Sequence, residues 1–181
     1  MKEEDKFKQA KELAIALSYL QIKKKLKNAK IEIIGFFNRA KQFNFEELLE
    51  VGIQYTQPFT NLKEGLGLAR AVIRKNRFDE NIIIIITDGR PTAILENDML
   101  RVELDESKAD SKIVNESLKE LREIIKQGTI VNFILFTALE ENANFVEEAR
   151  KIINGGIYVL ENSSMLKDKF ITQVRQYISP F

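Results

Sequence analysis

A run of five isoleucines, residues 82–86, constrains the fold of this chain more than any other feature. An apolar run without polar alternation is typical of a strand that is buried on both faces of a parallel sheet. The run ends in Thr87-Asp88-Gly89, and ligand sites in open α/β sheets lie where such strands end. Asp88 is therefore the strongest functional candidate, although Asp-Gly after a strand is also ordinary turn chemistry.

The rest of the chain alternates apolar strand patterns with amphipathic helix patterns, which predicts a mostly parallel sheet with helices on both faces. A tight turn at residues 38–39 predicts an antiparallel edge strand. The acidic stretch 94–110 lacks the order and the glycine of a calcium loop and is predicted to be a solvated loop. Parallel strands are predicted at residues 31–37, 82–87, 129–136 and 157–160, the edge strand at 40–43, and helices at 6–27, 45–51, 111–127, 143–154 and 163–178, with a further helix capped by Thr60 or Asn61 and ending at Asn76.

Composition limits the chemistry that the chain can perform. Its 181 residues suit one domain, residues 1–181, and contain no Cys and no His. Disulfides, thiolate chemistry and Ser-His-Asp triads are therefore excluded, and the residue most used as a general base near neutral pH is missing. The net charge of +1 provides no field that would attract nucleic acid or a membrane surface.

The amino terminus and the longest apolar runs bear on the compartment. The first six residues are mostly charged and lack the apolar core of a signal peptide, and no apolar run approaches the length of a membrane span. These features predict a cytoplasmic protein. Abundant Lys, Glu and Ile without Cys or Trp favour a thermophilic source.

The stretch 87–92, Thr-Asp-Gly-Arg-Pro-Thr, resembles the end of the fourth strand in the von Willebrand factor A (vWA) domain family, whose Asp helps to hold a divalent metal. Thr60, in a loop before a helix, matches the family's lone metal-binding Thr. Gly155-Gly156-Ile157-Tyr158 is similar to the family's Gly-Gly-x-Tyr before its last strand. The resemblance implies a three-layer, Rossmann-like fold.

The family's third metal-binding element, an Asp-x-Ser-x-Ser loop after its first strand, does not occur in this sequence. The resemblance therefore implies a domain without its first strand and a metal site reduced to Thr60 and Asp88. In the family this strand lies between the strands that match residues 31–37 and 82–87. Unpaired buried backbone groups cost about 1–3 kcal/mol each, a large part of a typical stability of about 5–15 kcal/mol. We expect the gap to be closed in one of three ways. The two strands pair directly, another chain supplies a strand or a second copy associates through the unpaired strands, or the reading frame starts upstream of Met1.

The vWA family is mostly a class of binding and scaffolding domains, some of which serve ring-shaped ATPases. The resemblance implies a protein-interaction module whose partner, such as a ring ATPase or a complex subunit, contacts Arg90, Pro91 and Thr92 beside the metal site. An intact site would hold Mg²⁺ or Mn²⁺, but two oxygen ligands hold such an ion weakly, so no cofactor is expected here. The alternatives are a degenerate, metal-free structural subunit and, with less support, a metal-assisted hydrolase centred on Asp88. We expect no enzymatic activity. Without His or Cys, and without a second carboxylate at a defined spacing from Asp88, the sequence does not assemble a base, a nucleophile and a charge stabiliser.

Overall fold

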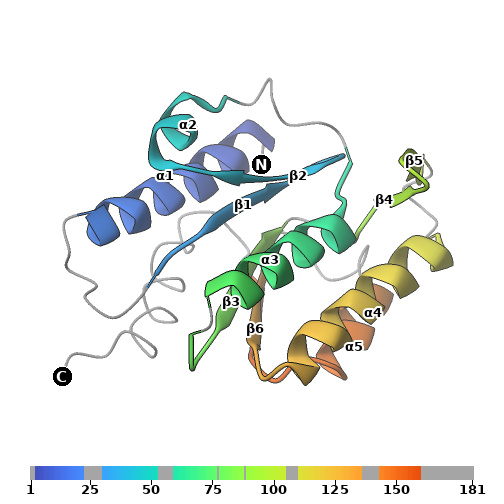
Figure 1. Cartoon of the computed structure of the whole chain (residues 1–181). Coiled ribbons are helices and arrows are strands. Elements are labelled where there is room, and N and C mark those ends of the chain that lie inside the picture. Colours follow the sequence, from blue (N-terminus) through green and yellow to red (C-terminus); the bar gives the residue numbers. More distant parts are fainter. Residues whose placement is uncertain are drawn as a thin grey trace.

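The computed structural model describes residues 3–22, 30–52, 59–76, 78–87, 89–104, 110–135 and 143–159, which form a Rossmann-like arrangement of helices and a parallel sheet (Figure 1). The helices are α1 (Glu3–Ile22), α2 (Phe45–Glu50), α3 (Leu62–Asn76), α4 (Ser111–Lys126) and α5 (Ala143–Arg150). The strands are β1 (Ile33–Phe36), β2 (Ala40–Phe43), β3 (Ile82–Thr87), β4 (Ala93–Glu96), β5 (Met99–Val102), β6 (Ile130–Leu135) and β7 (Ile157–Val159).

Three of the predicted parallel strands form one sheet, in the order β3-β6-β7. This pairing confirms the strand and the parallel direction predicted for the isoleucine run. The prediction that the run is buried on both faces is not met, because only Ile85 and Thr87 of β3 are buried. Within the described residues β3 pairs on one side only, so the middle position belongs to β6, in which residues 131–135 are all buried.

The strands β1 and β2 form a separate antiparallel ribbon. The predicted turn at residues 38–39 and the antiparallel direction of β2 are confirmed. The prediction that residues 31–37 belong to the parallel sheet is not met in the described part of the chain, where β1 pairs with β2 alone. Direct pairing of β1 with β3, one of the three expected solutions, is therefore not seen among these residues.

Helix α3 packs between the β1–β2 ribbon and α4 (Figure 1). Gly65 lies against β1 so closely that a Cβ placed on it would be 2.8 Å from the Cβ of Phe36. The glycine thus allows close packing of the helix on the ribbon. Leu62 and Leu66 of α3, which are 3% and 2% exposed, belong to the core cluster against which Phe36 also packs.

The main core lies between one face of the parallel sheet and the helices α3, α4 and α5. Phe133 of β6 and Phe145 of α5 meet edge to face with 6.2 Å between ring centroids, a favourable geometry for aromatic rings. Asn132 and Ile134, which alternate with Phe133 along β6, are also buried, so both faces of this strand are covered. The buried members of the core cluster are Leu62, Leu66, Ile85, Leu118, Leu121, Ile124, Val131, Phe133, Leu135, Phe145, Val146 and Ala149.

The ends of the helices agree with most of the sequence predictions. Helix α4 ends before Gly128, whose φ of +83° suits glycine as the helix stop. The helix predicted at 143–154 ends earlier, at Arg150, and α1 covers the described part of the helix predicted at 6–27. The helix predicted at residues 163–178 lies outside the described residues. So do Phe136 and Leu160, the last residues of the strands predicted at 129–136 and 157–160. Among the helices described here, none combines the length and apolar character needed to cross a membrane.

The stretch 94–110 was wrongly predicted to be a loop, because its first part forms the hairpin β4–β5. The two-residue turn consists of Asn97 and Asp98, with φ values of +50° and +63°. A type I′ hairpin turn has positive φ at both central positions, and Asn and Asp adopt positive φ more easily than other non-glycine residues. Ala93 and Ile94 of β4 are completely buried and anchor the hairpin, which explains why the segment is ordered.

Two glycines of α3 provide a matched test of this packing. We expect Gly65→Ala to lower the free energy of unfolding by about 1–3 kcal/mol, because the added methyl group overlaps Phe36. Gly67→Ala should be neutral or stabilising by up to about 1 kcal/mol, since its Cβ would meet only a Glu120 carboxylate oxygen at 3.9 Å. Urea unfolding of the two variants measures both values, and equal destabilisation would contradict the packing argument.

Candidate functional site

The isoleucine strand ends in a local turn. Thr87 is 7% exposed, and its hydroxyl accepts a hydrogen bond from the amide of Gly89 at 3.3 Å and donates to the Gly89 carbonyl at 3.2 Å. These bonds fold the chain back at the carboxyl end of β3, where the sequence placed the candidate carboxylate. Asp88 itself lies outside the described residues.

Thr60 lies beside the segment that follows β3. Its amide donates to the Thr92 hydroxyl at 2.9 Å, and its carbonyl accepts from the amides of Thr92 at 3.0 Å and Ala93 at 3.3 Å. Two segments that are 32 residues apart in sequence are thereby joined at the end of the sheet. The sequence placed residues 90–92 beside a site formed by Thr60 and Asp88, and the Thr60–Thr92 bonds bring residue 60 and this segment together. We call Thr60 and residues 90–92 the rim.

The three residues expected to contact a partner have different environments. Thr92 is half-buried and uses its hydroxyl to hold Thr60, Pro91 is buried, and Arg90 is half-buried. For the hydroxyl of Thr60, no hydrogen bond to another described residue is present.

Asn61, not Thr60, caps helix α3. Its side-chain oxygen accepts from the Glu64 amide at 3.1 Å, and the residue is completely buried. Its side-chain nitrogen donates to the Asn38 carbonyl at 3.0 Å and to the Glu64 carboxylate at 3.2 Å. The same Glu64 oxygen accepts from the Ala40 amide at 3.0 Å, and the Asn61 amide donates to the Phe37 carbonyl at 2.9 Å.

This network ties the turn after β1 to the start of α3, directly beside Thr60. The sequence reasoning considered Asn61 only as an alternative cap and did not identify Glu64. The signal was present, because Asn61 followed three residues later by Glu64 has the spacing of a capping box. In a capping box the Glu64 carboxylate would accept from the backbone amide of Asn61. Here it accepts from the backbone amide of Ala40 in the ribbon instead.

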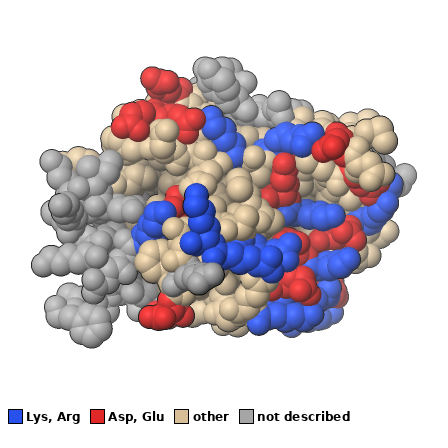
Figure 2. Space-filling model, viewed as in Figure 1, with Lys and Arg blue, Asp and Glu red and all other residues tan. Residues whose placement is uncertain are grey.

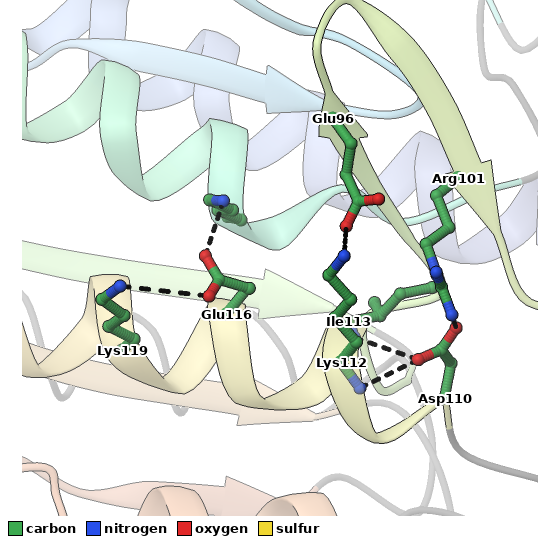
Figure 3. Close-up of polar contacts among 8 residues, drawn as sticks. Glu96, Arg101, Asp110, Lys112, Ile113, Glu116 and Lys119 are labelled. Atoms are coloured by element: carbon green, nitrogen blue, oxygen red, sulfur yellow. Dashed lines mark hydrogen bonds and ion pairs between the residues drawn. The ribbon is translucent and has the colours of Figure 1, made fainter.

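Ion pairs fix the hairpin β4–β5 to the start of α4 (Figure 3). Lys112 of α4 contacts the Glu96 carboxylate at 2.5 Å. Arg101 of β5 contacts one oxygen of Asp110 through two of its nitrogens, each at 2.8 Å. The other Asp110 oxygen caps α4 by accepting from the amides of Lys112 at 2.8 Å and Ile113 at 3.4 Å.

The environment of Asp110 favours its charged form. Partial burial is the largest single influence and raises the pKa of Asp110, but the bonds from Arg101 and from two backbone amides together outweigh it. The pKa of Asp110 is therefore held below its ordinary value of 3.8. One carboxylate thus orients the hairpin and starts the helix at the same time.

Charges on the visible surface are mixed in sign. Figure 2 shows basic and acidic side chains interspersed, most densely over the part of the molecule that holds α4 in Figure 1. Pairs such as Lys63–Glu116 and Arg70–Glu120, each at 2.8 Å, link α3 to α4. In the described part of the chain, no group of three or more His, Cys, Asp or Glu side chains is placed to hold a metal ion.

Two substitutions of Asp110 separate its roles. Asp110→Ala should lower the free energy of unfolding by about 1 kcal/mol, because it removes the cap of α4. Asp110→Asn should cost less, since Asn caps helices as well as Asp and only the ion pair with Arg101 is lost. Urea unfolding at pH 7 measures both effects, and equal losses in the two variants would contradict the double role.

The same residue predicts a pH dependence. A carboxyl group whose pKa is lower in the folded than in the unfolded state stabilises the fold above its unfolded pKa, and this contribution disappears as the pH falls through the folded pKa. For Asp110 that window lies below its ordinary pKa of 3.8. The stability difference between wild type and Asp110→Asn, measured by urea unfolding, should therefore be constant from pH 7 to pH 5 and shrink towards pH 3. A difference that grows on acidification would contradict the assignment.

The comparisons with known proteins identify the family of the chain. Residues 1–174 match the family described as "Rv0959-like protein, vWA domain". Protein Mb0984 of Mycobacterium bovis and protein Rv0959 of Mycobacterium tuberculosis are each 31% identical to the chain over 94 residues, which are 52% of this chain and 14% of either relative. The chain thus matches only a small part of the length of these relatives. Domains of the vWA type generally mediate protein–protein interactions, and this chain belongs to the vWA domain family, in its Rv0959-like group.

Proposed function

We propose that this chain binds another protein through its rim and that Thr60 and Asp88 supply only part of a vWA metal site. The observation that carries the proposal is the set of hydrogen bonds between Thr60 and Thr92, which joins two loops at the carboxyl end of the parallel sheet. Binding residues in α/β folds concentrate in such loops, because the sheet and its helices hold them in fixed positions. A ring ATPase or another subunit of a complex is the class of partner we propose.

The residues present do not fit a resident magnesium or manganese ion. Thr60 offers a neutral hydroxyl oxygen, and Asp88 adds a carboxylate according to the sequence. Mg²⁺ requires octahedral coordination and gives up its water ligands reluctantly, so two protein oxygens hold it weakly. We therefore propose that recognition depends on the protein atoms of the rim and that this chain carries no cofactor.

We further propose that the chain is not an enzyme. It has no His and no Cys, so a base and a nucleophile would both have to come from carboxylates, hydroxyls or lysines. The alternative is a degenerate, metal-free structural subunit that binds through the same rim.

Thermal unfolding with magnesium or with a chelator tests the metal proposal. A ligand that binds only the folded state stabilises it by RT ln(1 + [L]/Kd), about 2.7 kcal/mol at one hundred times Kd. We expect almost no difference in Tm between protein in about 10 mM MgCl₂ and protein in EDTA. This magnesium concentration is high enough to detect a site with a millimolar Kd. A shift of several degrees that Asp88→Ala abolishes would overturn the proposal of a weak, incomplete site.

Partner binding is tested by placing the same charge reversal at the two ends of β3. Asp88→Lys reverses the charge at the end of β3, two residues before the rim segment 90–92, and Asp79→Lys changes an exposed residue that precedes the strand. In affinity capture from a lysate of the organism that encodes the chain, we expect proteins enriched on wild type to fall about tenfold on Asp88→Lys and to persist on Asp79→Lys. Proteins that are lost equally on both variants, or on neither, would contradict binding through the rim.

A further inference from the structure

Among the described residues, the hairpin β4–β5 has one outer edge that is hydrogen-bonded, along β4, and one that is not, along β5. The amide of Glu103 donates to the Thr92 carbonyl at 2.8 Å, which continues the register of the hairpin by one step. Because hydrogen-bonded and non-bonded pairs alternate in an antiparallel ladder, the backbone groups of Ala93, Leu100 and Val102 face away from the partner strand. The amide of Ala93 accordingly donates to Thr60 on the outer edge of β4.

The outer edge of β5 has no such cover in the described part of the chain, where no hydrogen bond to the backbone of Leu100 or Val102 is present. Leu100 is 37% exposed and Leu104 is 79% exposed. These residues and the half-buried Val102 recur at every second position, the spacing of side chains on one face of a strand. Met99, on the neighbouring position of β5, is 70% exposed.

An exposed apolar edge strand is unusual in a soluble fold, because natural proteins shield such edges with charges, prolines or covering segments. Here the ion pairs Arg101–Asp110 and Glu96–Lys112 hold the hairpin in place (Figure 3). The edge is therefore oriented before any partner arrives, which reduces the entropy lost on binding.

The size of the edge indicates what kind of partner fits it. A stable dimer interface involves about 20–30 residues on each side, whereas β5 offers an edge of only a few residues. A short extended segment can use such an edge fully, since its backbone pairs with β5 while alternate apolar side chains pack on Leu100 and Leu104. The edge is also continuous with the rim through the bond between Glu103 and Thr92.

We propose that the outer edge of β5 binds a short extended segment of the partner protein by strand addition. This proposal rests on the proposed function, because it names the part of the partner that the region beside the rim recognises. The segment carries apolar residues at alternate positions, and its backbone bonds to the outward-facing groups of Leu100 and Val102.

The probe is a library of random eight-residue peptides displayed on phage and selected on the full chain in EDTA. We expect recovered peptides to carry alternating apolar residues and to bind Leu100→Lys at least about tenfold more weakly than wild type. Phe78→Lys is the matched control, because Phe78 is a comparably exposed apolar residue, 44%, that precedes β3. The recovered peptides should bind Phe78→Lys as tightly as wild type.

Amide hydrogen exchange measured by NMR on the wild-type complex provides a second readout that does not depend on any variant. Bound peptide should slow exchange at Leu100 and Val102, whereas Met99 and Arg101, whose amides face β4, should change little. Protection at other sites, equal binding to Leu100→Lys, or recovery of no binding peptide would overturn the proposal. A wild-type dimer in sedimentation that Leu100→Lys dissociates would assign the edge to a second copy and would overturn it as well.

The outcomes separate this proposal from the proposed function. If peptides bind β5 but captured proteins do not respond to Asp88→Lys, the result supports strand addition at β5 and contradicts partner binding through the rim. If captured proteins are lost on Asp88→Lys but peptides do not bind β5, the result supports partner binding through the rim and contradicts strand addition at β5.

Discussion

The buried side chain of Asn61 is the constraint on which the arrangement of the site depends. A completely buried amide is costly unless its donors and acceptor find partners, and here they bond to the Glu64 amide, the Glu64 carboxylate and the Asn38 carbonyl. These partners come from α3 itself and from the turn after β1. The start of α3, the ribbon and the neighbouring Thr60 therefore have fixed positions relative to one another.

Helix α3 connects this fixed region to the rest of the molecule through its packing contacts. Gly65 lets the helix lie close to β1, while Leu62 and Leu66 enter the core that it shares with the parallel sheet. The ribbon and the sheet are not hydrogen-bonded to each other within the described residues, so packing against α3 relates them. A helix that is fixed at its first turn and packed along its length can hold the rim without contributing a ligand itself.

The hairpin β4–β5, beside the rim, is also held in a fixed position by buried and charged contacts. Its base is buried through Ala93 and Ile94, and its strands are tied to α4 through Asp110, which also caps that helix. Exposed ion pairs contribute little stability on their own, but a carboxylate that also caps a helix fixes an orientation. The vWA fold thus presents two adjoining features, a polar rim and an apolar strand edge, from rigid supports.

The sequence alone determined the class of the fold and most of its helices and strands. The isoleucine run, the amphipathic helices and the stop at Gly128 are local signals, because side-chain periodicity and backbone preference act within a few residues. The hairpin at Asn97-Asp98 was also a local signal, but the acidic residues around it concealed the turn. Tertiary structure alone decided that Thr60 meets Thr92, that Glu64 bonds the ribbon and that β6 takes the middle of the sheet. These contacts join residues far apart in sequence, and which of several polar or apolar neighbours a residue meets depends on packing that no local pattern encodes.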